Sequence, residues 1–199
     1  MLATAEDESD GLLPQVLYIE QGEDIDTPML YPSPTSWHPG CQITYRGPQG
    51  HGFSVPSILR RIALIGYDNH PSRLMPLVQL GLKMKADIVI AGEFHDKPDI
   101  CKDIPPQIEL ADTDQIPELL GWADLTAIDV PMAKLSQLNE LTTQFDKLIR
   151  GKNIQVLVHT SMPCGGIAEC GICAVKTIRG YRLACQEGPV FDLADLKFS

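Results

Sequence analysis

Four cysteines near the C-terminal end of the sequence carry its clearest chemistry. They are Cys164, Cys170, Cys173 and Cys185, and their spacing is C-x5-C-x2-C-x11-C. Four thiolates gathered in this way bind a soft metal ion or an iron–sulfur cluster. Glycines between the cysteines suit a loop around a cluster, because glycine allows positive φ and a close approach of the backbone to sulfur. The pattern favours an iron–sulfur cluster, of the [2Fe–2S] type.

Two other kinds of site fit part of this pattern. A structural zinc site is usually built from two short Cys-x2–4-Cys pairs, and this segment contains only one. A thiol–disulfide site at Cys170 and Cys173 is also compatible with the spacing, but it leaves the other two cysteines of the segment unexplained. Cys41 and Cys101 have no partner at metal-ligand spacing, and we interpret both as ordinary cysteines.

Composition and charge narrow the class of protein. The 199 residues carry a formal net charge of −10, and 44% of them are hydrophobic, which is typical of a folded domain. Residues 1–45 contain eight acidic residues and no Lys or Arg. No basic stripe is available to bind a nucleic acid, and no apolar run reaches the roughly 20 residues that span a bilayer. The start lacks the pattern of a signal peptide, so we expect a cytoplasmic protein, where cysteines serve as metal ligands more often than as disulfides.

Short apolar runs alternate with amphipathic stretches between residues 61 and 159. Strands are expected at 62–66, 87–91, 108–110, 124–130 and 154–159, and helices at 72–85, 114–121 and 131–150. Ser72 and Asp114 are the expected helix caps. This alternation predicts an α/β fold with a doubly wound, mostly parallel sheet of about five strands. Such sheets bind ligands at the carboxyl ends of their strands.

Three segments follow from this organisation. Residues 1–57 form an acidic, proline-rich N-terminal segment with short extended pieces, residues 58–160 form the α/β unit, and residues 161–199 form a small cluster-binding domain. Within the last segment, residues 172–176 and 181–185 flank a turn at Gly180. We expect a hairpin there that carries Cys185 back to the other cysteines.

Three motifs resemble one family, the electron transfer subunits of dihydroorotate dehydrogenase B. Residues 163–175 read PCGGIAECGICAV and residues 183–191 read LACQEGPVF, as in that family's cluster domain. Residues 47–53 read GPQGHGF and resemble the GPLGNGF element between its flavin barrel and its nucleotide domain. The resemblance implies a ferredoxin-reductase-type nucleotide domain at 58–160. It also implies a non-catalytic, hetero-oligomeric subunit that passes electrons between a [2Fe–2S] cluster and a partner flavoprotein, in pyrimidine biosynthesis.

The resemblance does not extend to the FAD-binding barrel of the family. A barrel of six strands needs roughly 45–60 residues even with short turns, and only 46 residues precede Gly47. Many of these are acidic or proline, and none forms an Arg-x-Tyr-Ser-like flavin motif. We therefore regard residues 1–57 as a remnant of the barrel and do not expect FAD binding by this chain alone.

The nucleotide signatures of the family are also altered. Its glycine-rich turn GGGIGxAPL corresponds here to a turn that starts at Gly66, where Tyr67 and Asp68 replace glycines. A carboxylate at Asp68 would repel a pyrophosphate, although Arg73 could partly compensate. Gly66 and Arg73 are thus the candidate nucleotide-contacting residues. The later Cys-Gly-Pro of the family reads IDVP at residues 128–131, so both changes argue against NAD binding.

Two further functions stay open at this stage. One is a zinc-stabilised interaction module without a redox role. The other is an NAD(P)H-linked reductase component that takes its flavin from a partner. Three histidines on expected loops, His51, His70 and His95, could form a metal site, but solvated loop histidines are much commoner. No residue is expected to be catalytic.

Overall fold

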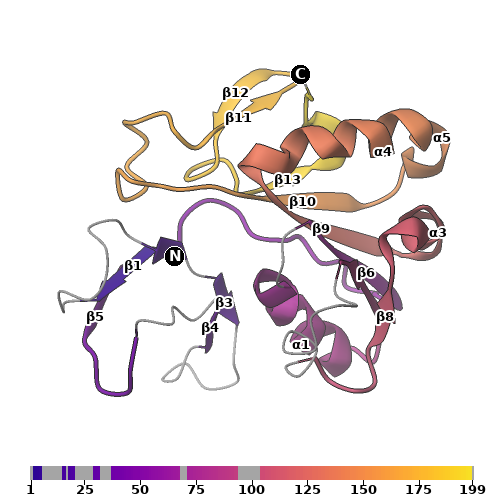
Figure 1. The fold of residues 1–199 in the computed structure, drawn as a ribbon, viewed down its shortest axis with the longest axis horizontal. Coiled ribbons are helices and arrows are strands. Elements are labelled where there is room, and N and C mark those ends of the chain that lie inside the picture. Colours follow the sequence, from indigo (N-terminus) through magenta and orange to yellow (C-terminus); the bar gives the residue numbers. More distant parts are fainter. Residues whose placement is uncertain are drawn as a thin grey trace.

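A six-stranded sheet organises the protein in the computed structural model (Figure 1). The structure describes residues 37–67, 71–93 and 104–198, and short strands within residues 2–31. The sheet order is β13-β10-β9-β6-β7-β8. Its strands are β6 (Arg61–Gly66), β7 (Asp87–Gly92), β8 (Glu109–Ala111), β9 (Leu125–Pro131), β10 (Ile154–His159) and β13 (Val190–Asp192). The first five are parallel, which confirms the predicted sheet, and β13 adds an antiparallel edge from the C-terminal segment.

Both faces of this sheet are buried, as its uninterrupted apolar strands require. In β6, Ile62 and Leu64 belong to the core under α1 (Met75–Lys83). Ala63 and Ile65 belong to the opposite core, under α3 (Ile116–Trp122) and α4 (Leu138–Gln144). Figure 1 shows α1 on one side of the sheet and α3 and α4 on the other. The sheet is therefore doubly wound, as predicted.

The prediction of one long helix over residues 131–150 is wrong, because this stretch forms three separate helical segments. A 3-10 helix η3 (Met132–Gln137) comes first, followed by α4 and then by α5 (Asp146–Ile149). Two threonine hydroxyls, of Thr142 and Thr143, both donate to the carbonyl oxygen of Asn139 and compete with the helical hydrogen bonds near the end of α4. In the described part of the chain, no helix has the length and apolar character needed to cross a membrane.

The expected helix caps are also corrected by the structure. Residues 71–74 form a 3-10 helix, η1 (Pro71–Leu74), so Ser72 is a buried helical residue and α1 begins three residues later. Before α3, the 3-10 helix η2 (Thr113–Gln115) is capped by Asp112 rather than Asp114. The Asp112 N–H donates to Oε1 of Gln115 over 3.0 Å. Several short polar residues lie near both helix starts in the sequence, and spacing alone did not identify the residue that caps the helix.

Short antiparallel strands occupy the N-terminal segment, in agreement with the expected β pieces. One sheet has the order β2-β1-β5, built from β1 (Leu2–Ala5), β2 (Gln15–Val16) and β5 (Ile43–Arg46). A second pairs β3 (Tyr18–Glu20) with β4 (Met29–Tyr31).

Asp124 anchors the amino ends of two neighbouring strands, β6 and β9. Its Oδ2 accepts hydrogen bonds from the N–H groups of Arg60 and Arg61, at 3.1 and 3.0 Å. The Arg61 guanidinium lies 3.7 Å from the other carboxylate oxygen and over the ring of Trp122. Burial opposes ionisation of Asp124, but the N–H donors and the arginine charges outweigh it and lower the pKa of the carboxyl.

Candidate metal centre and strand-end crevice

The four cysteines of the C-terminal segment come from one loop and one hairpin. Cys164 and Cys170 lie in the loop that follows β10, and Cys173 stands directly before β11 (Ala174–Thr177). The expected hairpin is present, because β11 pairs with β12 (Gly180–Leu183) and the Ala184 N–H donates to the Cys173 carbonyl oxygen over 2.9 Å. This pairing brings Cys185 to Cys173, and their sulfur atoms lie 3.4 Å apart.

The four thiols differ sharply in burial. Cys173 and Cys185 are 1% and 2% exposed, whereas Cys164 is half-buried and Cys170 is exposed. Burial raises the pKa of Cys185 to about 11, and the neighbouring sulfur of Cys173 adds to this effect. One side of the group therefore faces the protein interior, and the other side faces outward.

Backbone N–H groups surround the outward side. Donors at Cys170, Glu169 and Gly166 point at the Cys164 sulfur, and together with the Cys170 thiol they lower the pKa of Cys164 to about 6. The loop can point them inward because it takes positive φ at four positions, which are Gly165, Gly166, Ala168 and Gly171. An anionic sulfur centre is stabilised by such donors.

Two thiol–thiol contacts link the four cysteines in pairs. The Cys164 and Cys170 side chains are hydrogen-bonded, as are those of Cys173 and Cys185, and Cys164 is near enough to Cys185 to affect its ionisation. A single tetrahedral zinc would draw four sulfurs to about 3.8 Å from one another. Among the described residues, no three His, Cys, Asp or Glu side chains are grouped closely enough for one metal ion. Four thiols on one loop and one hairpin are the kind of donor set that an iron–sulfur cluster takes.

A segment far away in sequence packs against this loop and hairpin. Nε2 of Gln49 donates to the Gly165 carbonyl oxygen over 3.2 Å. The His51 N–H donates to the Gly188 carbonyl oxygen, and the Val190 N–H donates back to the His51 carbonyl over 3.3 Å. The GPQGHGF motif and the segment after Cys185 therefore form one unit, a contact that sequence analysis did not predict.

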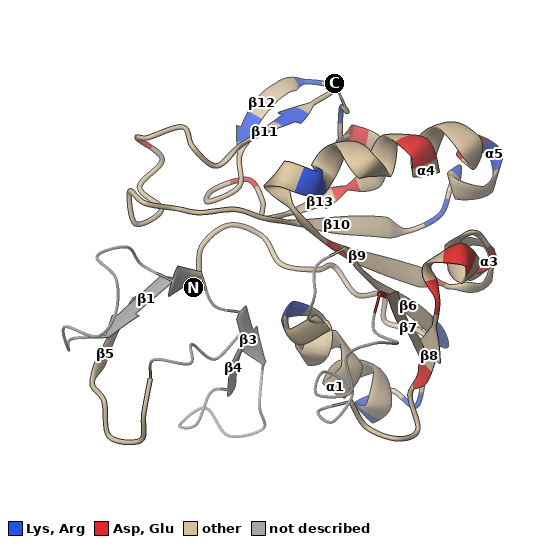
Figure 2. Ribbon diagram, viewed as in Figure 1, with Lys and Arg blue, Asp and Glu red and all other residues tan. Residues whose placement is uncertain are grey.

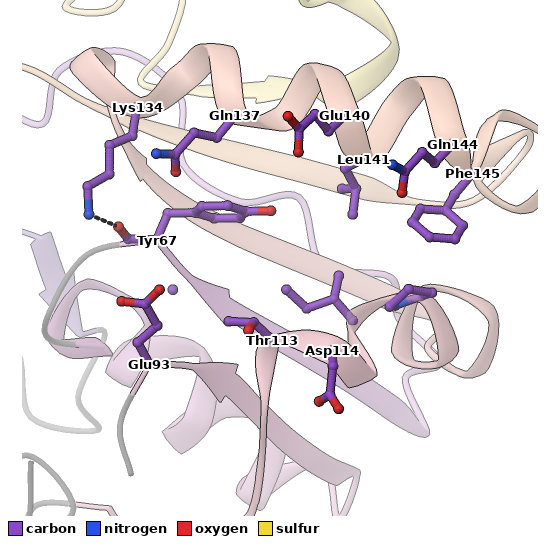
Figure 3. A pocket seen from close by; sticks show the side chains of 13 residues that line it. Tyr67, Glu93, Thr113, Asp114, Lys134, Gln137, Glu140, Leu141, Gln144 and Phe145 are labelled. Carbon is purple, nitrogen blue, oxygen red and sulfur yellow. Dashed lines mark hydrogen bonds between the residues drawn. The ribbon is translucent and has the colours of Figure 1, made fainter. Parts of the chain in front are cut away.

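A separate cavity of about 620 Å³ lies at the carboxyl ends of the parallel strands (Figure 3). Tyr67 projects into it from the end of β6, and Glu140 approaches from α4. Burial raises the pKa of Tyr67, and the Glu140 charge raises it further. The cavity lies where a doubly wound sheet binds its ligands, since the chain changes direction between β6 and β9.

The charge of this cavity is predominantly negative among the described residues. Three carboxylates line it, from Glu93, Asp114 and Glu140. The cation among its described lining residues is Lys134, whose Nζ donates to the Tyr67 carbonyl oxygen over 2.7 Å. Asp68 lies outside the described residues, as do the two residues after it.

Arg73 does not line this cavity, because its guanidinium is held inside the protein. Its Nη1 lies 3.2 Å from Oδ2 of Asp129, which is fully buried, and its Nη2 lies 3.0 Å from Nε2 of His159. Gly66 does line the cavity, so the two candidate nucleotide residues are separated. Asp129 was missed as a partner, although an acidic residue inside the apolar run of β9 is a recognisable signal.

The remaining candidates in the sequence have simpler outcomes. Cys41 is half-buried and, like the other described cysteines, is a free thiol. Cys101, His70 and His95 lie outside the described residues, so the three-histidine site stays a prediction.

Comparison with known proteins finds a matching family model for the cysteine segment and two similar proteins. Residues 159–197 match the family model of the iron–sulfur cluster binding domain of dihydroorotate dehydrogenase B. The dihydroorotate dehydrogenase B (NAD(+)) electron transfer subunit of Clostridium perfringens is 23% identical over 171 residues, covering 80% of this chain and 68% of the relative. A probable subunit of the same kind from Pyrococcus furiosus is 24% identical over 167 residues, covering 76% and 62%. The chain thus spans about two thirds of the length of these relatives.

The fold is also that of a known redox protein. A solved structure of an NADH-dependent reduced ferredoxin–NADP oxidoreductase aligns with a TM-score of 0.56 and 18% identity, over 79% of this chain and 60% of that one. The ferredoxin-reductase-like fold predicted from sequence is confirmed. The chain is related to the electron transfer subunits of dihydroorotate dehydrogenase B, and its residues 159–197 match the iron–sulfur cluster binding domain of that family.

Proposed function

We propose that this chain is an electron-transfer subunit whose four clustered cysteines hold one [2Fe–2S] cluster. The carrying observation is the division of the thiols into two pairs, Cys164 with Cys170 and Cys173 with Cys185. A two-iron cluster takes four cysteine ligands, two on each iron. The bound cluster supplies one-electron transfer. The chain contributes the thiolates, the N–H donors around the Cys164 sulfur and the buried wall behind Cys173 and Cys185.

The two alternatives explain less of this arrangement. A structural zinc site is usually built from two short Cys-x2–4-Cys pairs, and this segment contains only one. A thiol–disulfide site would use Cys170 and Cys173 and would leave Cys164 and Cys185 without a role. Free thiols at every described cysteine also suit a reducing, cytoplasmic location.

Metal and sulfide analysis of anaerobically purified chain tests this proposal. We expect about two irons and two acid-labile sulfides per chain, with visible absorption that bleaches on reduction. A control chain with Cys41→Ser should keep both, because Cys41 lies outside the group, whereas Cys173→Ser should lose them. Stoichiometric zinc in a colourless protein would replace the redox proposal with the zinc-stabilised interaction module.

We further propose that the partner is a flavoprotein catalytic subunit, as the names of the relatives suggest. Exposed apolar side chains lie on the segment that carries Cys173 and Cys185: Ile172 just before Cys173, and Ile178 and Tyr181 at the turn end of the hairpin, with 57%, 61% and 72% exposure. Basic residues lie on the same hairpin, on β11, on β12 and in the turn, and Figure 2 shows them in blue. They are Lys176, Arg179 and Arg182. This surface suits a partner with an apolar centre and an acidic rim.

Copurification followed by substitution tests the partner. Ile178→Asp should leave the iron content unchanged and lower the rate of electron transfer to the copurifying flavoprotein at least tenfold. Leu110→Asp, on the far edge strand β8, is a control, because Leu110 is also exposed. Equal rates for both variants would remove this surface as the docking site.

We also propose that the cavity at the carboxyl ends of the parallel strands does not bind a dinucleotide in this chain alone. Lys134 is occupied by the Tyr67 carbonyl, and Arg73 by Asp129, so neither is poised for a pyrophosphate. The carboxylates that line the cavity would repel one. NADH titration should give no binding at millimolar concentration. Binding at micromolar concentration would instead support an NAD(P)H-linked reductase component.

A further inference from the structure

The peptide group between Gly165 and Gly166 links a distant side chain to a cluster cysteine. Its carbonyl oxygen accepts the hydrogen bond from Nε2 of Gln49, at 3.2 Å. Its N–H, on Gly166, points at the sulfur of Cys164. One planar group therefore receives a donor on one side and gives a donor to sulfur on the other.

Gln49 is held in place by its own backbone neighbours. The next residues, Gly50 and His51, pack on the turn after Cys185, where His51 bonds with Gly188 and Val190. Gly50 fits there because a Cβ would stand 1.8 Å from the Gly188 carbonyl oxygen. The backbone that follows Gln49 is therefore fixed on the turn after Cys185, and the Gln49 side chain extends from there to the loop that carries Cys164.

The contact between Gln49 and the loop is also close. A Cβ on Gly166 would lie 1.6 Å from Oε1 of Gln49, so the carboxamide lies directly against the Gly166 backbone. Gly166 has φ of +74°, which a side chain would disfavour for a second reason. The glycine and the glutamine therefore fit each other, and the peptide between Gly165 and Gly166 has one orientation in this contact.

We propose that Gln49 is a positioning residue that raises the reduction potential of the cluster through the Gly165–Gly166 peptide. The inference rests on the proposed [2Fe–2S] cluster. A hydrogen bond to a peptide carbonyl polarises the peptide and strengthens the bond that its N–H donates. Reduction adds one electron and one negative charge to the cluster, and an N–H directed at a ligand sulfur stabilises the more negative state. Gln49 acts on the cluster only through this peptide.

Gln49→Leu is the variant that removes this effect. Oε1 of Gln49 is buried and meets no donor in the described part of the chain, so an apolar side chain also removes a desolvation penalty, and the variant should fold. Gln49→Glu keeps the size, cannot donate to the Gly165 carbonyl, and adds a negative charge. Gln42→Leu is the matched control, because Gln42 is exposed on the same segment.

Reduction potentials of the purified full chains, measured by anaerobic titration with iron and sulfide analysed in parallel, decide the question. We expect full iron content in all variants. The one-electron equilibrium constant for reduction should be about threefold smaller in Gln49→Leu than in the parent chain. At ~59 mV per tenfold, this corresponds to a reduction potential lower by about 30 mV. The potential of Gln49→Glu should fall further, and that of Gln42→Leu should match the parent chain.

Three results would overturn the inference, and they are distinguishable. A loaded Gln49→Leu chain with the parent potential would show that the contact does not affect the cluster. Loss of iron from Gln49→Leu would show that Gln49 is needed to assemble the site rather than to set its potential. A parent chain without iron and sulfide would remove the proposed function itself, and this inference with it.

Discussion

Replacement of Gly50 by alanine tests whether the GPQGHGF segment is a structural part of the cluster site. Gly50 has φ of +64°, and an added Cβ would lie 1.8 Å from the Gly188 carbonyl oxygen and 3.1 Å from that of Ala184. Both neighbours are backbone, which cannot rotate away. The segment must therefore separate from the turn that follows Cys185.

The expected loss of stability follows from what is broken. Alanine in the left-handed region costs about 1 kcal/mol. Separation also breaks two backbone hydrogen bonds, from His51 to Gly188 and from Val190 to His51, each contributing about 1 kcal/mol. We expect Gly50→Ala to lower the free energy of unfolding by about 3 kcal/mol. With a urea m-value of ~2 kcal/mol/M, the midpoint should fall by about 1.5 M.

Gly52 supplies the matched control, two residues along the same segment. No heavy atom lies within 4 Å of a Cβ built there, and its φ is not in the left-handed region. Gly52→Ala should therefore change stability by less than ~0.5 kcal/mol, with a small gain from the stiffer unfolded chain. Urea unfolding followed by circular dichroism measures both variants. Equal midpoints for the two would refute the reasoning, because the packing of Gly50 on Gly188 would then contribute nothing.

Three more perturbations have defined outcomes. Gly166→Ala should lower the cluster potential more than Gly165→Ala, because both positions have a positive φ that strains alanine but only at Gly166 does the added Cβ displace the adjacent glutamine amide; equal potentials would contradict this. Arg73→Met should destabilise the chain by about 3 kcal/mol in urea unfolding, because it leaves the fully buried Asp129 without this cation, and adding Asp129→Leu should recover part of the loss. Asp124→Asn should be less stable than the parent near pH 7. The folded-state pKa of Asp124 is lowered, so the stability difference between parent and variant is fully present above the unfolded pKa of about 3.9. The difference is lost as the pH falls through the folded-state pKa. A difference in thermal unfolding that does not depend on pH would contradict this prediction.

Strand positions were predictable because their signal is local. An apolar run such as residues 154–159 is typical of a strand that is buried on both faces, and the structure places β10 between β9 and β13 inside the sheet. The division of residues 132–149 into η3, α4 and α5 was not predictable from periodicity. Two threonine hydroxyls near the end of α4 donate to the Asn139 carbonyl, and an apolar stripe carries no record of such local competition.

The candidate nucleotide residues mark the limit of motif reasoning. Arg73 follows the altered glycine turn, so its position in the sequence suggested a phosphate contact. Its partner, Asp129, is 56 residues away and lies inside a strand. An arginine is drawn to the nearest buried carboxylate, since an unpaired charge in the core is costly. Which carboxylate is nearest depends on the order of β6 and β9 in the sheet.

The amino-acid sequence by itself identified the candidate thiol ligands of this protein. Four cysteines within 22 residues, with glycines between them, predict a thiolate site because a short loop and a hairpin can bring them together. Only the tertiary structure decided which thiols are buried and which peptide Gln49 holds. Gln49 and Gly165 are 116 residues apart, and their contact exists because β13 pairs with β10 and the GPQGHGF segment packs beside it. Contacts at that separation follow from how strands assemble, which no local pattern encodes.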